Sequence, residues 1–294
     1  MKRLVFALPG NEQLASKIRN GINGQNGEFI IRQFPDKETY IRILSDVAEQ
    51  PVIVVCTLHQ PDDKLLPLFF LCKLLKDLKV KNICIVAPYL SYMRQDKAFN
   101  SGEAITSNYF AALLSSFVDQ LITIDPHLHR RNSLKEIYSI PCEALHAANL
   151  ISSWIKKNIP NAVIIGPDEE SEQWVAEVAK NAGVPFIVLQ KIRHGDSDVE
   201  VSVPNVATYK NHTPVLVDDI ISTARTMIET IHHLAKEKMN PAICIGVHAV
   251  FAGDAYKSLL NSGVKEVITC NTISHESNGI DVSDMLIDAL KKLA

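Results

Sequence analysis

The sequence predicts an α/β protein of two similar halves, each a mostly parallel β-sheet flanked by helices. Short apolar runs alternate along the chain with longer stretches of helical periodicity, the pattern of parallel strands joined by crossover helices. Ten such runs exceed the usual number of strands in one sheet, so two sheets are the simpler arrangement. The length of 294 residues is sufficient for two hydrophobic cores of ordinary size.

The apolar runs and amphipathic stretches place the elements in order along the chain. A boundary within residues 141–147 gives an N-terminal domain at 1–144 and a C-terminal domain at 145–294. No low-complexity linker separates the domains, so we expect them to pack closely. The expected strands are 4–8, 29–31, 52–56, 83–87 and 121–124 in the first half and 162–165, 186–189, 215–217, 243–247 and 267–269 in the second, with helices at 65–78, 104–115 and 174–182.

Composition excludes several classes of function. The net charge of -3 provides no basic surface field that would hold nucleic acid. No apolar run approaches the ~20 residues that cross a bilayer, so we expect no membrane association. The six cysteines include no Cys-x-x-Cys pair, and four of them lie in or beside apolar runs as small hydrophobic residues. A reducing cytoplasm is the simplest location.

The most informative stretch is 215–226, which reads Val-Leu-Val-Asp-Asp-Ile-Ile-Ser-Thr-Ala-Arg-Thr. Its apolar start predicts a buried strand that stops at Asp218 and Asp219, at the sheet edge where α/β proteins bind ligands. Ser222 and Thr223 precede a helical pattern, and a helix N-terminus with hydroxyl groups can bind phosphate. The two carboxylates can then accept hydrogen bonds from sugar hydroxyls. The alternative is a capped helix after a strand whose aspartates are only solvated.

Two further stretches follow strands in the first half. The segment 88–97 carries aromatic rings that can stack on a base and Arg94, which can bind phosphate oxygens, although an exposed loop is the alternative. Asp125 and His127 can hold a divalent cation such as Mg²⁺, although a lone histidine is more often structural. Arg130 and Arg131 can meet anionic groups.

The second half contains two more candidate segments. Asp168 follows the strand 162–165 and offers a second acidic group, or else begins an acidic first helical turn. Lys191 and Arg193 lie in a Gly-containing segment, 191–198, that can close over a polyphosphate as a mobile lid. A solvated hairpin loop is the alternative for this segment.

Taken together, these stretches resemble a known family. The stretch 215–226 resembles the loop that binds 5-phosphoribosyl 1-diphosphate (PRPP) in type I phosphoribosyltransferases (PRTases) and PRPP synthetases. The remaining stretches are similar to synthetase motifs only, and the resemblance covers nearly the whole chain in order. It implies two PRTase-like domains. It also implies ATP binding by Phe34, Asp36, Glu38, Arg94, Gln95, Asp96 and Lys97, a metal site at His127, Asp168 and Asp125, catalytic Lys191 and Arg193, and ribose 5-phosphate binding by Asp218, Asp219, Ser222, Thr223, Ala224, Arg225 and Thr226.

The resemblance implies that the chain transfers a diphosphoryl group from Mg²⁺–ATP to ribose 5-phosphate. It also implies a homo-oligomer in which Phe34, Asp36 and Glu38 reach the adenine end of ATP in a neighbouring subunit. A phosphoribosyltransferase and a non-catalytic, synthetase-like regulatory subunit are the alternatives. Arg225 stands where the family usually has glycine. Because a glycine there permits a positive φ, we expect a gentler turn with a negative φ at Arg225, whose side chain then extends into solvent.

Overall fold

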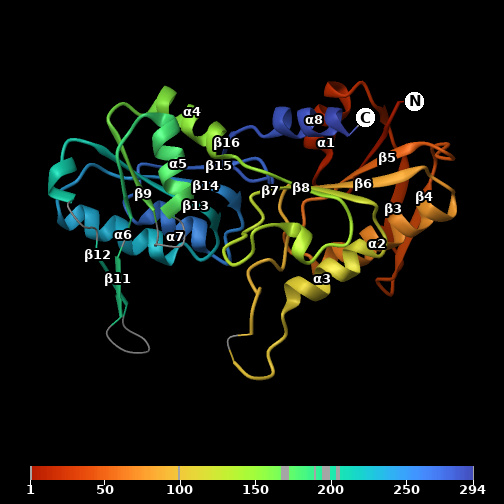
Figure 1. The fold of residues 1–294 in the computed structure, drawn as a ribbon, viewed down its shortest axis with the longest axis horizontal. Coiled ribbons are helices and arrows are strands. Elements are labelled where there is room, and N and C mark those ends of the chain that lie inside the picture. The colour runs from red at the N-terminus through yellow and green to blue at the C-terminus, as the bar shows by residue number, and fades with distance from the viewer. Residues whose placement is uncertain are drawn as a thin grey trace. The chain divides into compact units, whose positions relative to one another are not determined.

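The computed structural model describes residues 2–98, 100–166, 172–188, 190–193, 199–202 and 206–293 (Figure 1). The chain forms two compact units, one comprising Met1–Leu145 with Ser283–Ala294 and the other His146–Val282. The sequence-based boundary between residues 144 and 145 therefore differs from this grouping mainly at the C-terminal helix. None of the described helices is long and apolar enough to cross a membrane.

The first unit is built on a six-stranded parallel sheet with the order β2-β1-β5-β6-β7-β8. Helices α1 and α8 lie on one face of this sheet and α2 and α3 on the other (Figure 1). An antiparallel hairpin, β3–β4, is inserted between β2 and β5. The elements are β1 (Leu4–Ala7), α1 (Glu12–Gly21), β2 (Gln25–Asn26), β3 (Phe29–Gln33), β4 (Thr39–Ile43), β5 (Pro51–Val55), α2 (Asp62–Asp77), β6 (Asn82–Ala87), α3 (Thr106–Ser115), β7 (Gln120–Ile124), β8 (Cys142–Leu145) and α8 (Ser283–Lys292).

The second unit repeats this topology. Its parallel sheet has the order β10-β9-β13-β14-β15-β16, with α4 and α5 on one face and α6 and α7 on the other (Figure 1). A second antiparallel pair, β11–β12, again precedes the third strand of the sheet. The elements are α4 (Ala148–Asn158), β9 (Ala162–Gly166), α5 (Glu172–Ala182), β10 (Phe186–Val188), β11 (Gln190–Arg193), β12 (Val199–Ser202), β13 (Thr213–Ile221), α6 (Arg225–Lys236), β14 (Ile243–Ala249), α7 (Ala255–Asn261), β15 (Glu266–Cys270) and β16 (Asn278–Ile280).

The expectation of two similar α/β halves is confirmed. Strands of the sheet interiors formed where the apolar runs predicted them, because helices cover both faces and bury successive side chains. In β5, for example, all residues from Val52 onward are buried. The sequence analysis did not find β2, β8 and β16, which are short edge strands without a buried apolar run; β2 is exposed at both residues.

Helices α4 and α8 each pack within the compact unit to which they belong. Helix α4 follows β8 in the chain and packs on α5. Nδ2 of Asn181 on α5 donates to Oδ1 of Asn149 on α4 at 2.8 Å. Helix α8 follows β16 but packs on α1 in the first unit. The two helices approach closely at Gly21, where a Cβ would lie 2.4 Å from Cδ1 of Ile287. Arg3 donates to the carbonyl of Leu290, which anchors the end of α8.

Candidate active site

The carboxyl edge of the second sheet carries Asp218 and Asp219. Strand β13 pairs with β9 only as far as Leu216 but pairs with β14 up to Ile221. The expectation that the strand stops at Asp218 was therefore wrong. Polar residues are tolerated in the extension because β9 no longer covers that side, and both aspartates are half-buried. Both carboxylates thus lie on the part of β13 that extends beyond its pairing with β9 and stays paired with β14.

The turn after β13 is held by the backbone of the segment after β14. Phe251 donates its N–H to the carbonyl of Ile221 at 2.9 Å, and Ala252 donates to that of Ser222 at 3.1 Å. Ala224 then takes a left-handed conformation with φ 56° as the N-cap of α6. Ser222 and Thr223 precede the cap, and the N-cap residue makes no side-chain capping bond. The first-turn N–H groups of α6 point toward this turn, and the side chain of Ala224 has no acceptor that could cap them.

Arg225 is the first residue of α6 and is exposed. The positive φ that glycine would provide falls one position earlier, on Ala224. The expectation of a negative φ at Arg225 is confirmed, but the turn still contains one left-handed residue. Gly246, which pairs with Asp218, lets the side chain of Ile221 pack directly against the backbone of β14, because a Cβ at Gly246 would lie 2.6 Å from Cγ1 of Ile221.

A buried thiol lies beneath the acidic pair. Cys244 on β14 is fully buried in the core of the second unit. Burial raises the pKa of its thiol, and the charge of Asp218 raises the pKa further. The thiol therefore stays protonated at neutral pH and acts as a hydrophobic core residue, as the sequence indicated.

In the first unit, the structure brings two predicted segments together at the carboxyl edge of the sheet. The segment after β6 holds Asp96, whose carboxylate binds Nη1 of Arg130 at 3.1 Å and whose side chain is only 3% exposed. Arg131 donates to the carbonyl of Asp96 at 3.3 Å and to Oδ1 of Asn108 at 2.8 Å. Arg130 and Arg131 thus bind protein groups, which is a different use from the anionic ligands that the sequence suggested.

Gln95 also contacts protein groups. Its Oε1 accepts from the hydroxyl of Thr106 at 2.9 Å, and its carbonyl accepts from the N–H of Ser107 at 3.3 Å, which fixes the start of α3. Arg94 and Lys97 on either side are exposed. Within the predicted ATP segment, Gln95 and Asp96 therefore anchor the loop, while Arg94 and Lys97 present positive charge at its surface.

Asp125 and His127 form a tight turn directly after β7. The N–H of Asp125 donates to the carbonyl of Leu145 at 2.9 Å, and the N–H of His127 donates to the carbonyl of Asp125 at 2.9 Å. Both residues have positive φ, 37° and 53°. The ring of His127 stacks on that of His129, with centroids 3.8 Å apart. Asp125 is buried and His127 half-buried, so the turn holds a carboxylate and an imidazole in a fixed backbone geometry.

The hairpin β3–β4 carries Phe34, Asp36 and Glu38 at its tip, and all three are exposed. Oδ1 of Asp36 accepts from the N–H of Glu38 at 3.2 Å. Lys191 and Arg193 belong to β11, paired with Val201 and Val199, so this part of the expected loop is a strand. Their side chains lie outside the described part of the structure, as does Asp168 entirely.

A titratable pair at the end of β5 was not predicted. Nζ of Lys64 lies 2.9 Å from Nδ1 of His59 and 3.1 Å from the carbonyl of Thr57. Burial and then the charge of Lys64 lower the pKa of His59 to about 4, so this imidazole is neutral at pH 7. His59 lies in the loop between β5 and α2, and Lys64 lies in the first turn of α2. This loop matches by topology the loop between β13 and α6. The sequence signal that could have pointed to the His59–Lys64 pair is the repeat of the same strand and helix order in the two units.

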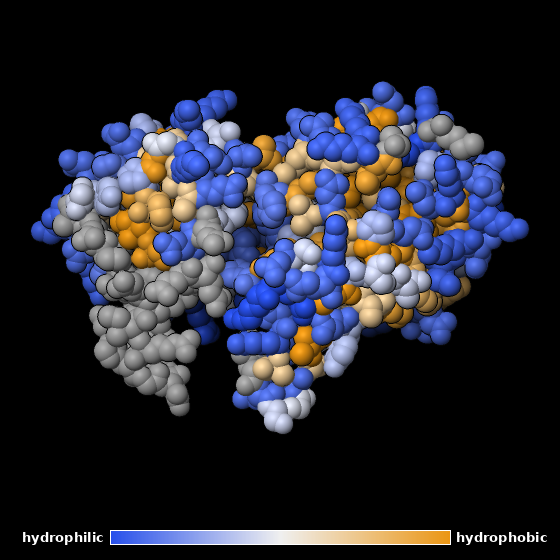
Figure 2. All heavy atoms as spheres, in the orientation of Figure 1, coloured by the Kyte–Doolittle hydropathy of each residue, from blue (hydrophilic) through white to orange (hydrophobic). Residues whose placement is uncertain are grey.

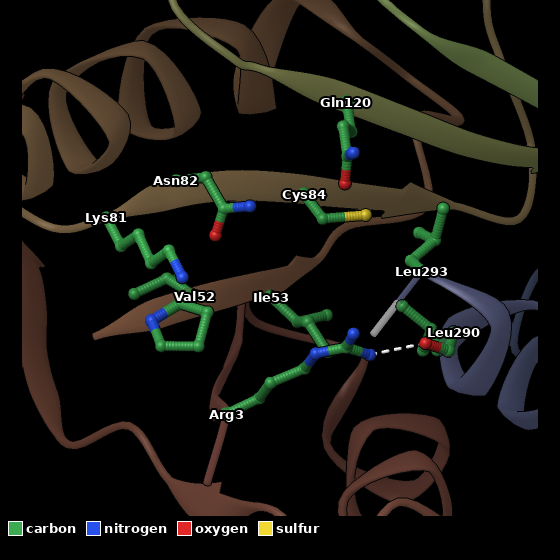
Figure 3. Close-up of a pocket in the computed structure, with 10 residues that line it drawn as sticks. Arg3, Val52, Ile53, Lys81, Asn82, Cys84, Gln120, Leu290 and Leu293 are labelled. Atoms are coloured by element: carbon green, nitrogen blue, oxygen red, sulfur yellow. Dashed lines mark hydrogen bonds between the residues drawn. The ribbon is translucent and has the colours of Figure 1, made fainter. Parts of the chain in front are cut away.

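A pocket of about 460 Å³ lies at the opposite, amino edge of the first sheet (Figure 3). The side chains of Arg3, Lys81 and Asn82 line it together with Cys84 and Leu290. Its lining contains none of the site residues that the sequence predicted. Burial raises the pKa of the Cys84 thiol to about 12, against a smaller lowering effect of Arg3. The pocket is therefore separate from the candidate site of this unit.

Comparisons with known proteins agree across the whole chain. Residues 3–117 match the family model for the N-terminal domain of ribose phosphate pyrophosphokinase, and residues 133–284 match that for the phosphoribosyl transferase domain. A ribose-phosphate pyrophosphokinase of Sulfurisphaera tokodaii is 31% identical over 258 residues, which cover 86% of this chain and 87% of that protein. One from Methanothermobacter thermautotrophicus is 29% identical over 289 residues, covering 98% and 100%.

The fold also matches a solved structure. The crystal structure of phosphoribosylpyrophosphate synthetase from Mycobacterium smegmatis superposes with a TM-score of 0.87 and 22% sequence identity. The match covers 100% of this chain and 99% of that chain. At this identity the likeness concerns the fold, which agrees in both units.

Proposed function

The chain belongs to the ribose-phosphate pyrophosphokinase family, and from this premise we propose that it transfers the diphosphoryl group of ATP to the 1-hydroxyl of ribose 5-phosphate. The products are PRPP and AMP, for nucleotide biosynthesis. The observation that carries this proposal is that one chain holds both sets of segments. The first unit has the segment 94–97 with Asp125 and His127 at the carboxyl edge of its sheet, and the second unit has the PRPP-type loop after β13. The match of residues 3–117 to the N-terminal synthetase domain favours it over a phosphoribosyltransferase.

Ribose 5-phosphate is the ligand that we assign to the end of β13. Asp218 and Asp219 accept hydrogen bonds from the ribose hydroxyls, and the turn from Ser222 to Thr226 binds the 5-phosphate. The support is that the N-cap residue Ala224 makes no side-chain capping bond, which leaves the first N–H groups of α6 available to an anion at the positive end of the helix dipole.

We assign ATP to the carboxyl edge of the first unit. Arg94 and Lys97 bind phosphate oxygens, and Gln95 and Asp96 keep their loop in place through Thr106 and Arg130. Asp125 and His127 fit Mg²⁺, because they supply a carboxylate and an imidazole from one rigid turn. When bound, Mg²⁺ neutralises charge on the phosphate oxygens. Phosphoryl-type transfer needs little more than such positioning and charge neutralisation.

We further propose that copies of the chain associate. Apolar side chains reach the surface over α2 and α3 (Figure 2). Leu66 and Phe70, one helical turn apart on α2, are 59% and 42% exposed, and Leu113 on α3 is 41% exposed. Exposed apolar groups arranged this way are typical of surfaces that contact another protein. The hairpin β3–β4 then reaches the ATP of a neighbouring copy.

The test of the proposed function is AMP release from ATP in a coupled assay. We expect AMP formation to require both ribose 5-phosphate and Mg²⁺, and EDTA to abolish it. ADP as the nucleotide product, or AMP release that does not depend on ribose 5-phosphate, contradicts the assignment. Addition of PRPP and a purine base in place of the two substrates provides the control for phosphoribosyltransferase activity.

Arg225 provides a second, smaller prediction. We expect Arg225→Gly to leave the KM for ribose 5-phosphate within a few-fold of the parent, because Arg225 is exposed and the left-handed residue is Ala224. The free energy of unfolding should fall by at most about 1 kcal/mol, the usual cost of glycine in a helix. A charge-assisted phosphate contact would be worth ~1.5–3 kcal/mol. A KM raised tenfold or more at unchanged kcat would therefore make Arg225 a substrate ligand.

A further inference from the structure

The hairpin β3–β4 has one face on the core and one face exposed. Phe29, Ile41 and Ile43 pack against the core of the first unit. Side chains alternate along a strand, so Arg32, Phe34 and Tyr40 fall on the opposite face. Phe34 there is 41% exposed, which is unusual for a phenylalanine beside a well-packed core.

These three side chains form one compact cluster. Arg32 and Tyr40 are directly opposite each other in the register of the hairpin. The guanidinium carbon of Arg32 lies 4.8 Å from the ring centroid of Phe34 and 4.4 Å from that of Tyr40. The two rings also contact each other edge to face, with centroids 5.9 Å apart and an interplanar angle of 84°. We call this cluster the Arg32 stack.

The backbone at the hairpin tip supports the stack. The N–H of Phe34 donates to the carbonyl of Glu38 at 2.8 Å, and the N–H of Lys37 donates to the carbonyl of Phe34 at 2.9 Å. Lys37 takes a φ of 71°, a conformation that closes the turn. The position of Phe34 is thus fixed by the turn, while the orientation of its ring is fixed by Arg32 and Tyr40.

An exposed ring that is already oriented loses less conformational entropy when a flat ligand stacks on it. Stacking between an aromatic side chain and a base is a substantial source of affinity in nucleotide and nucleic-acid sites. We propose that Arg32 and Tyr40 are positioning residues that hold the Phe34 ring ready to stack on the base of the nucleotide substrate. This inference rests on the proposed function, because ATP is the nucleotide concerned.

The test uses the full-length protein with 4-fluorophenylalanine at position 34, followed by ¹⁹F NMR. We expect Arg32→Ala to move the resonance toward its position in the unfolded chain, and Arg32→Lys to retain part of the parent shift. Arg42→Ala is the matched control, since Arg42 is an exposed arginine on the same strand pair and face of the hairpin. An unchanged resonance in Arg32→Ala overturns the inference.

ATP titration of the same signal measures the dissociation constant without turnover. Arg32→Ala and Tyr40→Ala should each weaken ATP binding roughly three- to tenfold, because each removes ring contacts of modest strength. Tyr40→Phe, which keeps the ring, and Arg42→Ala should stay within about twofold of the parent. In steady state, the KM for ATP should rise while the KM for ribose 5-phosphate and kcat do not.

Two failures are distinguishable. An ATP dissociation constant that Arg32→Ala leaves unchanged overturns the inference whatever the AMP assay shows. A parent protein that binds ATP with the expected dependence on Arg32 but releases no AMP contradicts the proposed function and leaves the nucleotide-positioning role supported.

Discussion

Replacing Lys191 or Arg193 by alanine is expected to lower kcat by ~10²–10³, by analogy with the loss of one charge-stabilising donor in other active sites. Both residues lie on β11. A cation that meets charge mainly in the transition state contributes little to ground-state binding, so the KM for ribose 5-phosphate should change little.

Steady-state kinetics in both substrates decide this prediction. Lys210→Ala, an exposed lysine in the same unit, is the control and should leave kcat unchanged. Lys191→Arg, which keeps the charge, should recover part of the loss. If the alanine variants raise KM and spare kcat, the β11 residues are binding elements only, and the assigned catalytic role is wrong.

The second large effect is expected at the end of β13. Asp218→Asn and Asp219→Asn preserve shape but replace a charged acceptor, and hydrogen bonds to charged groups are worth ~1.5–3 kcal/mol. We therefore expect the KM for ribose 5-phosphate to rise roughly 10- to 100-fold for each variant while the KM for ATP stays within a few-fold. Initial-rate measurements at saturating ATP provide the comparison.

Glu237→Gln, at the far end of α6, is the matched control because it removes an exposed carboxylate from the same unit. It should leave both KM values unchanged. Thermal unfolding of all three variants separates a local effect from a loss of folding. If Asp218→Asn and Asp219→Asn both bind ribose 5-phosphate normally, the pair is only solvated, which is the alternative that the sequence left open.

The sequence predicted the sheet interiors well because their signal is local. The residues from Val52 to Val55 are all apolar, so the side chains on both faces of the strand are apolar. This pattern is typical of a strand that is buried on both faces. Strand β2 consists of exposed Gln25 and Asn26 and exists only because β1 offers it a partner. Helix α8 shows the same limit, since its apolar face does not reveal that it packs on α1.

The sequence predicted the residue types of the candidate site but not the contacts that each side chain makes. The stretch 94–97 was identified as a nucleotide motif, yet in the structure Asp96 forms a salt bridge with Arg130 and Gln95 accepts a hydrogen bond from Thr106. Arg130 lies 34 residues from Asp96 and Thr106 lies 11 residues from Gln95, and neither separation follows from a spacing rule for helices or strands. Likewise, the left-handed residue in the turn before α6 is Ala224, a position that composition alone marks as ordinary.

The most direct test of the central claim follows the β-phosphorus of ATP. The protein is incubated with β-³²P-labelled ATP, ribose 5-phosphate and Mg²⁺, and the products are separated. The account predicts that the label appears in 5-phosphoribosyl 1-diphosphate, in amounts equal to the AMP released and only when ribose 5-phosphate is present. Label that remains in ADP, or that is released as free phosphate or diphosphate without a sugar product, would contradict the diphosphoryl transfer proposed here.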